Sequence, residues 1–288
     1  MKNFFRLLRA KQWVKNTFLF FPLLFSGSVF EDGLFGKTLI VFGGFCLVAS
    51  SLYVFNDLID LEKDRVHPKK SQRPLVKYKI NTGLIVGLIL VMLGVGLFII
   101  QRVDVDCLWP VLLYVVLNLI YNFYAKSIVI LDVMFVAFGF HIRIWTGSLA
   151  ANAPPSAWLQ LCVFLLALFL GFTKRRAEFN FLKEKAAEHR QVLSHYTLYL
   201  LDQIIIICST LAIVFYGLYT ISPDVVARLE SYKMVYSLVF VIYGIFRYLY
   251  LVHVKRLGEE PSEILLKDKP LLINIVLWIL YVGILIYR

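Results

Sequence analysis

The chain has 288 residues, of which 60% are hydrophobic and only 17% are charged, and its mean hydropathy is +0.75. Because a water-soluble domain is ordinarily about half apolar, this composition excludes a soluble enzyme or binding module and indicates an integral membrane protein. In a chain this apolar, the formal net charge of +11 favours juxtamembrane cations that face anionic lipid and phosphorylated substrates over a nucleic-acid-binding surface.

Nine stretches of the chain are long and apolar enough to cross a bilayer as helices. In chain order they cover residues 13–30, 38–58, 82–101, 107–124, 128–149, 157–173, 197–221, 234–254 and 270–287. The first is short and contains Pro22, and Pro154 with Pro155 ends the fifth. The sequence shows no internal repeat and no linker-like segment. It therefore predicts an all-α, polytopic membrane protein with nine transmembrane helices in a single domain that covers residues 1–288.

The basic residues set the orientation of these helices. Most of the 30 Lys and Arg residues precede the first stretch or follow the second, sixth and eighth, which an alternating nine-helix topology places on one side. The positive-inside rule makes that side cytoplasmic. We therefore expect a protein of the inner (cytoplasmic) membrane, with its N-terminus in the cytoplasm and its C-terminus outside.

The motif Asn56–Pro74 follows directly on the second stretch and is the most informative segment of the chain. Asp57, Asp60 and Asp64 are spaced i, i+3 and i+7, so on a helix they share one face. Carboxylates at a membrane surface need a compensating charge, and Mg²⁺ takes oxygen ligands and shares them with a substrate phosphate. We therefore expect Mg²⁺ here, held by Asn56 and the three aspartates. A basic segment that attracts a diphosphate follows: Lys63, Arg65, Lys69, Lys70 and Arg73. A charged loop that only maintains topology is the alternative, but topology needs Lys and Arg rather than aspartates at helical spacing.

A second cluster lies at the end of the sixth stretch and contains Lys174, Arg175, Arg176 and Glu178. Three consecutive cations at a membrane face can be simple snorkelling anchors. An amphipathic continuation indicates instead an interfacial helix that covers a site, and its apolar residues are Phe179, Leu182, Ala186, Val192 and Leu193. We therefore treat the four residues of the cluster as candidate substrate contacts.

A third group of candidates comes from the fourth and fifth stretches and contains Tyr121, Lys126, Asp132 and Arg143. Lys126 alone could be a surface anchor, but Asp132 lies inside a predicted span, where a carboxylate needs a partner or a wet cavity. Asp132 and Arg143 fall within ~20° of one helix face. That face should point into a central polar cavity that is open to the cytoplasmic side. A purely structural Asp–Arg network is the alternative. Lys15, in a basic and aromatic segment at the first span, is a weaker signal.

Nine spans with Asn-Asp-x-x-Asp-x-x-x-Asp at the cytoplasmic end of the second resemble the UbiA superfamily of intramembrane prenyltransferases. Four extended motifs are similar to one branch, the decaprenyl-phosphate phosphoribosyltransferases, and they cover Lys11–Asn16, Asn56–Pro74, Gly139–Arg143 and Glu260–Pro270. The superfamily carries a second aspartate-rich motif after the sixth span, where this chain has Lys174-Arg-Arg-Ala-Glu178. A second acidic motif would repel a phosphorylated lipid, whereas these cations attract it, so the departure favours the same branch.

The resemblance implies a Mg²⁺-dependent phosphoribosyltransferase. It would bind phosphoribosyl diphosphate and a polyprenyl phosphate at the membrane, without nucleic acid, and a homo-oligomer is compatible with it. The lipid phosphate would attack ribose C1 and pyrophosphate would leave, so positioning and charge neutralisation suffice without a strong base. The implied catalytic residues are Asp57, Asp60, Asp64, Lys126 and Asp132. The implied substrate contacts are Lys15, Asn56, Lys69, Arg73, Tyr121, Arg143, Lys174, Arg175, Arg176 and Glu178.

Two other functions compete with this interpretation. An ordinary prenyltransferase, which moves a prenyl chain from its diphosphate to an aromatic or other acceptor, predicts a second acidic cluster after the sixth span. Only Glu178 and Glu184 are available there. A transporter for an anionic solute would also use basic residues and intramembrane charges, but it predicts pseudo-symmetric halves, which the sequence does not show.

Overall fold

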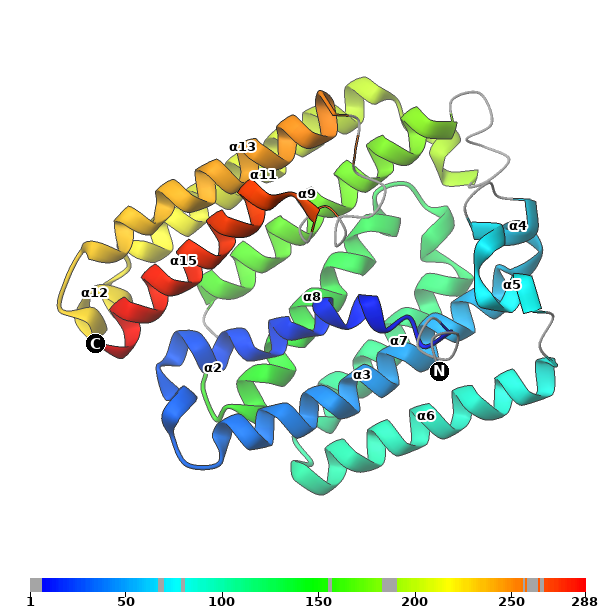
Figure 1. The fold of residues 1–288 in the computed structure, drawn as a ribbon, viewed down its shortest axis with the longest axis horizontal. Coiled ribbons are helices and arrows are strands. Elements are labelled where there is room, and N and C mark those ends of the chain that lie inside the picture. The colour runs from blue at the N-terminus through cyan, green and yellow to red at the C-terminus, as the bar shows by residue number, and fades with distance from the viewer. Residues whose placement is uncertain are drawn as a thin grey trace. The chain divides into compact units, whose positions relative to one another are not determined.

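The computed structural model describes residues 7–66, 70–78, 81–154, 157–182, 191–255, 257, 264 and 267–288. Throughout these residues the regular structure is helical, without a strand (Figure 1). Seven of the described helices are long and apolar enough to cross a membrane. The all-α, polytopic membrane class predicted from composition is therefore confirmed.

The chain forms two compact units. Unit 1 comprises Met1–Phe135 and Ile142–Pro154, and unit 2 comprises Val136–His141 and Pro155–Arg288. The single membrane domain expected over residues 1–288 stays a prediction, and the two units are described one at a time.

The first predicted span, residues 13–30, is not one α-helix. The chain forms a 3-10 helix, η1 (Ala10–Phe20), then α2 (Phe21–Ser26) and a last 3-10 turn, η2 (Ser28–Phe30). Pro22 sits in the first turn of α2, where its missing N–H is tolerated. Gly27 ends that helix with φ +86°, a conformation that residues with a Cβ rarely adopt. The segment is therefore divided by its own proline and glycine.

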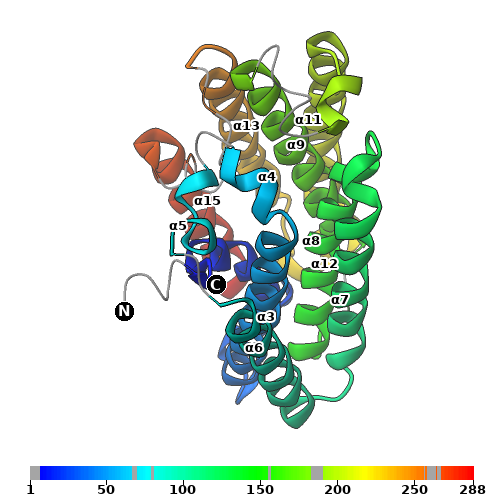
Figure 2. The same cartoon turned by 90° about the vertical axis from the view of Figure 1, so that its right-hand side faces the viewer.

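Helix α3 (Leu34–Ile59) is the longest element of unit 1 and carries Asp57 in its last turn. Its 26 residues extend about 39 Å, which is enough to cross the bilayer core. It lies along α6 (Thr82–Val103), as Figure 1 and Figure 2 show. Two glycines allow this approach, because a Cβ added at Gly96 would lie 2.7 Å from the carbonyl oxygen of Gly44. Small residues at a crossing are a common way for membrane helices to pack closely.

Four short helices and two longer ones complete unit 1. In chain order these elements are α4 (Leu61–Val66), η3 (Lys70–Gln72), α5 (Pro74–Tyr78), α7 (Leu108–Phe123), η4 (Ala125–Ser127) and α8 (Leu131–Ala150), the last of which also contains Val136–His141 of unit 2. Helix α7 is apolar but shorter than the seven spans. The buried core of the unit gathers side chains from several helices, including Val41, Phe45, Val48, Ile100, Val111, Tyr114 and Ile142.

Unit 2 consists of long helices joined by short ones. In chain order they are α9 (Ala157–Leu182), η6 (Gln191–His195), α11 (Leu198–Thr220), α12 (Pro223–Leu229), η7 (Lys233–Ser237), α13 (Leu238–His253) and α15 (Lys269–Tyr287). Helix α9 packs along α11, and α13 packs along α15 (Figure 1). Large apolar side chains are exposed on α15, as expected for a surface that faces lipid: Ile273, Val276, Leu277, Leu280 and Ile284.

Candidate functional site

The aspartates of the Asn56–Pro74 motif lie where α3 ends and α4 begins. Asp57 is in the last turn of α3, Asp60 ends that helix, and Asp64 is in α4. Helix-like backbone bonds continue across the break, from the Asp60 N–H to the Asn56 carbonyl at 3.0 Å and from the Asp64 N–H to the Asp60 carbonyl at 2.8 Å. Asp57 and Asp64 are buried, with 5% and 3% of their surface exposed, and Asp60 is half-buried. The helical spacing of the motif therefore persists in the fold.

Arg73 joins two of these carboxylates. One of its terminal nitrogens, Nη1, donates to Asp57 Oδ1 at 2.7 Å and also donates to Asp64 Oδ2. Arg73 lies directly before α5, so the short helices after α3 fold the basic end of the motif back onto its acidic end. The structure thus brings together three residues that are up to 16 positions apart in the chain.

A second cation, Arg9, contacts Asp57 and was not expected from the sequence pattern. Its Nε donates to Asp57 Oδ2 at 2.9 Å and its Nη2 donates to Oδ1, which makes a bidentate pair. The guanidinium also lies 5.8 Å from the centre of the Tyr53 ring. Arg9 has φ +51° and ψ +42°, a left-handed conformation that residues with a Cβ seldom adopt. The only sequence signal for Arg9 was its place among the basic residues before the first span.

Ser50 fixes the segment around Arg9 to α3. The Ser50 hydroxyl donates to the Leu8 carbonyl at 2.9 Å and accepts from the Trp13 indole N–H at 2.9 Å. Ser50, Tyr53 and Asp57 are spaced i, i+3 and i+7 on α3, so they share one helix face. One face of α3 therefore binds both the residues around Arg9, through Ser50, and the guanidinium of Arg9 itself, through Asp57.

Lys126 is paired with the third aspartate of the motif. Its Nζ lies 2.8 Å from Asp60 Oδ1. Lys126 belongs to η4, directly after α7, and the end of α7 packs on α3 with the Phe123 ring edge-on to Phe55 at 6.2 Å. Tyr121, also in the last turns of α7, is half-buried. Cations from three separate segments thus accompany the three aspartates.

The intramembrane charges Asp132 and Arg143 are both buried, but they are too far apart for a direct ion pair. Eleven residues of α8 separate them, which is about 16 Å along the helix axis. Arg143 donates from Nε to Asn16 Oδ1 at 2.8 Å and from Nη2 to the Tyr114 hydroxyl at 3.0 Å. Its guanidinium also lies 5.2 Å from the centre of the Phe45 ring. Asp132 and Arg143 are therefore two separate buried charges on α8 and not an ion pair.

The remaining candidate substrate contacts of unit 1 are Lys15, Asn56 and Lys69. Lys15 in η1 and Asn56 in the last turn of α3 are both half-buried. Lys69 lies outside the described residues, and so do residues 183–190, within the segment that was expected to continue as an interfacial helix.

In unit 2, the basic cluster after the sixth predicted span makes ion pairs with nearby carboxylates. Arg175, only 4% exposed, donates to Glu178 Oε2 at 2.8 Å, and Lys174 Nζ lies 3.9 Å from Glu178 Oε1. Arg176 donates from Nε to Oδ1 of Asp202 on α11. The five residues carry three positive and two negative charges, so the cluster keeps an excess of positive charge.

Sequence reasoning did not single out Asp202 as a candidate, nor a second carboxylate of unit 2, Asp268, although Asp268 lies within the Glu260–Pro270 motif. Asp202 lies inside the predicted span 197–221, and a carboxylate at such a position is a signal from which the sequence could have identified it. His253 lies 3.3 Å from Asp202. Asp268 accepts two hydrogen bonds from Arg247, at 3.1 and 2.8 Å, and one from the N–H of Leu271 in the first turn of α15. The hydrogen bonds from Arg247 lower the pKa of the Asp268 carboxyl below its usual range.

The carboxylates of the motif suit a divalent cation that shares its ligands with a phosphate. Asp57 Oδ1 and Asp64 Oδ2 converge on one nitrogen of Arg73, so a positive charge already lies between them. Mg²⁺ is usually held by one or two carboxylates, while substrate phosphates and waters complete its octahedron. Within the part of the chain that the structure describes, no three His, Cys, Asp or Glu side chains converge as a ready-made metal site. The donor set thus fits a cation that arrives together with a diphosphate.

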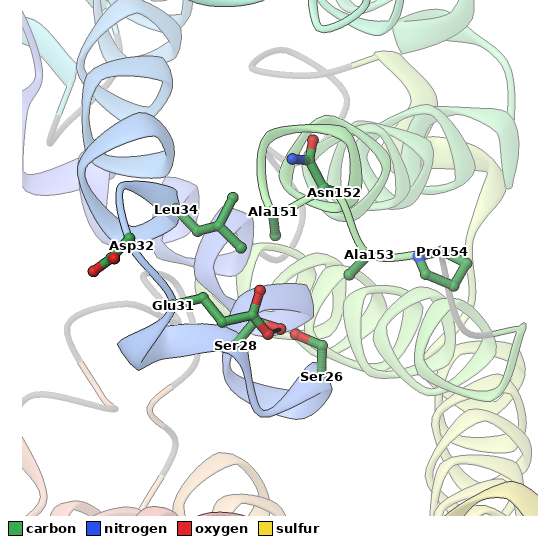
Figure 3. A pocket seen from close by; sticks show the side chains of 9 residues that line it. All are labelled: Ser26, Ser28, Glu31, Asp32, Leu34, Ala151, Asn152, Ala153 and Pro154. Carbon is green, nitrogen blue, oxygen red and sulfur yellow. Dashed lines mark hydrogen bonds between the residues drawn. The ribbon is translucent and has the colours of Figure 1, made fainter.

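A cavity of about 680 Å³ lies at the other end of α3 (Figure 3). It is lined by the α2–α3 connection and the end of α8, through Ser26, Ser28, Glu31, Asp32, Leu34, Ala151, Asn152, Ala153 and Pro154. From Leu34 to Asp57, helix α3 rises about 35 Å, so this cavity is remote from the aspartates. The charge pairs that define the candidate site lie around the motif and not in this cavity.

The helical architecture of the chain has a counterpart among solved membrane-protein structures. A solved structure of a UbiA homologue from Archaeoglobus fulgidus, bound to GPP and Mg²⁺, superimposes with a TM-score of 0.71 over 99% of this chain and 100% of that chain, at 18% identity. At this identity the likeness establishes the fold alone. The sequence profile of the UbiA prenyltransferase family matches residues 17–266. The chain therefore belongs to the UbiA prenyltransferase family.

Within the family, the chain is similar over nearly its whole length to the decaprenyl-phosphate phosphoribosyltransferases. It is 32% identical to that of Mycolicibacterium smegmatis, over 98% of this chain and 92% of the relative. It is 30% identical to that of Corynebacterium glutamicum, over 98% of this chain and 86% of the relative. The resemblance inferred from the motifs is therefore confirmed, for the superfamily and for this branch, and the protein is a multi-pass membrane transferase.

Proposed function

We propose that the protein transfers the 5-phosphoribosyl group of phosphoribosyl diphosphate to a polyprenyl phosphate of the decaprenyl type and releases pyrophosphate. The observation that carries the proposal is the meeting of Asp57, Asp60 and Asp64 with three cations at one end of α3. Such a site can bind a diphosphate through a metal ion and through basic side chains together. The near full-length similarity to decaprenyl-phosphate phosphoribosyltransferases supports phosphoribosyl diphosphate as the particular diphosphate.

The proposed reaction is a substitution at C1 of the ribose. An oxygen of the lipid phosphate forms a bond to C1, while the bond from C1 to the diphosphate oxygen breaks and pyrophosphate leaves with the electron pair. Because the lipid phosphate is anionic near neutral pH, no side chain has to act as a strong base. The protein therefore has to position the two substrates and neutralise the leaving group.

The proposed metal ligands are the amide oxygen of Asn56 and the three aspartates of the motif. When bound, Mg²⁺ would stabilise the charge that develops on the leaving pyrophosphate. Two of the carboxylates already face one positively charged nitrogen of Arg73, which supports a cation at that position. The Mg²⁺ in the structure of the Archaeoglobus fulgidus homologue supports divalent metal use in the family.

The basic residues are proposed to hold the two phosphorylated substrates. Lys126, which Asp60 holds at 2.8 Å, and Arg73 would bind the diphosphate. The positive excess of the unit 2 cluster suits the phosphate of the lipid, and the residues of that cluster are Lys174, Arg175, Arg176 and Glu178. The remaining proposed contacts are Lys15, Lys69, Tyr121 and Arg143, and Asp132 is proposed as a further catalytic residue.

We also propose the finer topology that the charges predict. The seven long helices, together with α7 and the η1–α2 segment, would make nine spans in one domain, around a central cavity open to the cytoplasm. The Lys and Arg distribution supports an inner-membrane protein with a cytoplasmic N-terminus and an external C-terminus. A homo-oligomer stays a prediction.

The test is a transfer assay with the purified full-length protein in lipid nanodiscs. Phosphoribosyl diphosphate labelled in the ribose, decaprenyl phosphate and Mg²⁺ should move the label into the lipid phase, and EDTA should abolish this transfer until Mg²⁺ or Mn²⁺ is restored. Asp60→Asn should lose most turnover, whereas Asp106→Asn, which changes an exposed aspartate between α6 and α7, should keep it. Full transfer in the presence of EDTA would overturn the metal-dependent mechanism.

An ordinary prenyltransferase is the second candidate, and the carboxylates of unit 2 favour it. Besides Glu178, which belongs to the basic cluster, Asp202 pairs with Arg176, so this function has one more acidic residue available than the sequence motif indicates. The same purified protein distinguishes the two functions. Pyrophosphate release that requires a prenyl diphosphate and is indifferent to phosphoribosyl diphosphate would reject phosphoribosyl transfer.

A further inference from the structure

Arg9 is paired with a carboxylate that the proposed metal site requires. We infer that Arg9 is a diphosphate-binding residue, held on Asp57 until a divalent cation and a diphosphate arrive together. The inference rests on the proposed function only in that it requires Mg²⁺ and a diphosphate, whichever group is then transferred.

Around Asp57, two guanidinium groups face two carboxylates, so the charges balance. The Asp57 carboxylate accepts two hydrogen bonds from Arg9 and one from Arg73, and Arg73 also donates to Asp64. Asp57 is nearly inaccessible to water, and in such surroundings a charge pair is stronger than at an open surface. A metal ion alone can therefore bind Asp57 only by displacing a guanidinium, which would lose its carboxylate and gain no anion in return.

A diphosphate supplies the missing anion. Asp57 and Asp64 would hold the metal ion, and a diphosphate bound with that ion would bring phosphate oxygens close to Asp57, on which Arg9 is now held. A guanidinium forms bidentate hydrogen bonds with phosphate as well as with carboxylate. Arg9 can thus exchange Asp57 for a phosphate oxygen without leaving the site. The exchange favours the metal and the diphosphate together over either ligand alone.

The local structure keeps Arg9 available for this exchange. Its left-handed backbone is held from both sides, because Leu8 and Trp13 are both hydrogen-bonded to Ser50 on α3. The Tyr53 ring lies beside the guanidinium, and an aromatic face adds favourable contact without competing for its N–H groups. The side chain can therefore change partners while its backbone stays fixed to the helix that carries Asp57.

Calorimetric titration of the full-length protein in nanodiscs tests the inference through binding rather than turnover. One titration uses MgCl₂ alone, and the other uses pyrophosphate at a fixed, high concentration of free Mg²⁺. Arg9→Gln should bind Mg²⁺ alone several-fold more tightly, because Asp57 loses a competing cation. The same variant should bind pyrophosphate at least about ten-fold more weakly, since a charge-assisted hydrogen bond to the ligand is lost.

Lys37→Gln is the matched control, because Lys37 is paired with Asp104 at 2.7 Å and lies near the other end of α3. It should change neither affinity. Arg9→Lys, which keeps the charge but not the bidentate geometry, should shift both affinities in the same directions as Arg9→Gln by smaller factors, and it serves if Arg9→Gln does not fold.

Opposite signs in the two titrations distinguish the exchange from simpler roles. Weaker binding of both ligands would mean that Arg9 only maintains the fold, and this result would overturn the inference. Unchanged or tighter pyrophosphate binding would mean that Arg9 never leaves Asp57, which also overturns it. A failure to transfer label from phosphoribosyl diphosphate to lipid would refute the proposed function but leave both binding results unaffected, so the two failures can be told apart.

Discussion

Replacing Gly96 with alanine should force α3 away from α6. A Cβ at this position would lie 2.7 Å from the carbonyl oxygen of Gly44, 2.9 Å from Cγ2 of Val48 and 3.1 Å from the nitrogen of Val48. Two of these atoms belong to the backbone and cannot rotate away. Because ordinary contacts begin at 3.4 Å, the helices must separate by about 0.7 Å at this crossing.

The size of the effect follows from comparison with Gly94 on the same helix, where an added Cβ would meet no atom within 4 Å. Both substitutions gain about 1 kcal/mol of helix propensity, so this gain cancels in the difference between them. Overpacking typically costs about 1–3 kcal/mol. We therefore expect Gly96→Ala to be less stable than Gly94→Ala by about 1–3 kcal/mol.

The assay is thermal unfolding of both variants in the same detergent, followed by the transfer assay. Gly96→Ala should melt several degrees below Gly94→Ala, which should melt at or above the wild-type temperature. Because α3 carries Asp57, a shift of the helix should also lower kcat/KM, since small displacements of positioned groups reduce rates strongly. Equal melting temperatures for the two variants would refute the claim that the glycines determine how closely these helices pack.

Three further perturbations test other parts of the structure. Replacing Lys126 with glutamine removes the positive charge that pairs with Asp60. Because a charged hydrogen bond is worth about 1.5–3 kcal/mol, kcat/KM for phosphoribosyl diphosphate should fall about ten-fold or more. Unchanged kinetics would exclude Lys126 from the site. In a cysteine-free background of intact cells, a cysteine at Gln72 should be protected from an impermeant thiol reagent and one at Asp224 should react, whereas the reverse pattern would overturn the topology. Asp268→Asn should keep the N-terminal cap of α15 and lose the ion pair, while Asp268→Ala loses both, so the melting temperature should fall in the order wild type, Asn, Ala. The folded pKa of this aspartate is lowered, so the difference between wild type and Asn should be complete above the unfolded pKa and disappear as the pH falls through the folded value.

The sequence by itself determined the class of the protein and the chemistry of its main motif. Long apolar stretches cannot leave the bilayer without a large free-energy cost, so hydropathy alone was sufficient to predict a helical membrane protein. The spacing of Asp57, Asp60 and Asp64 is a property of one continuous stretch of backbone, and it survives the break between α3 and α4. The motifs likewise carried the family resemblance, because each one is local in the chain.

Only the tertiary structure decided which cation meets which carboxylate. The pairs Arg9–Asp57 and Lys126–Asp60 join residues 48 and 66 positions apart, and Arg143 reaches Asn16 across 127 positions. A basic residue near the end of a span satisfies the positive-inside rule whether or not it faces an aspartate, so its sequence context cannot identify its partner. The choice depends on how closely the helices pack and on a left-handed turn at Arg9. Both are properties of the assembled helices, because contacts distant in sequence exist only after the chain between them has folded.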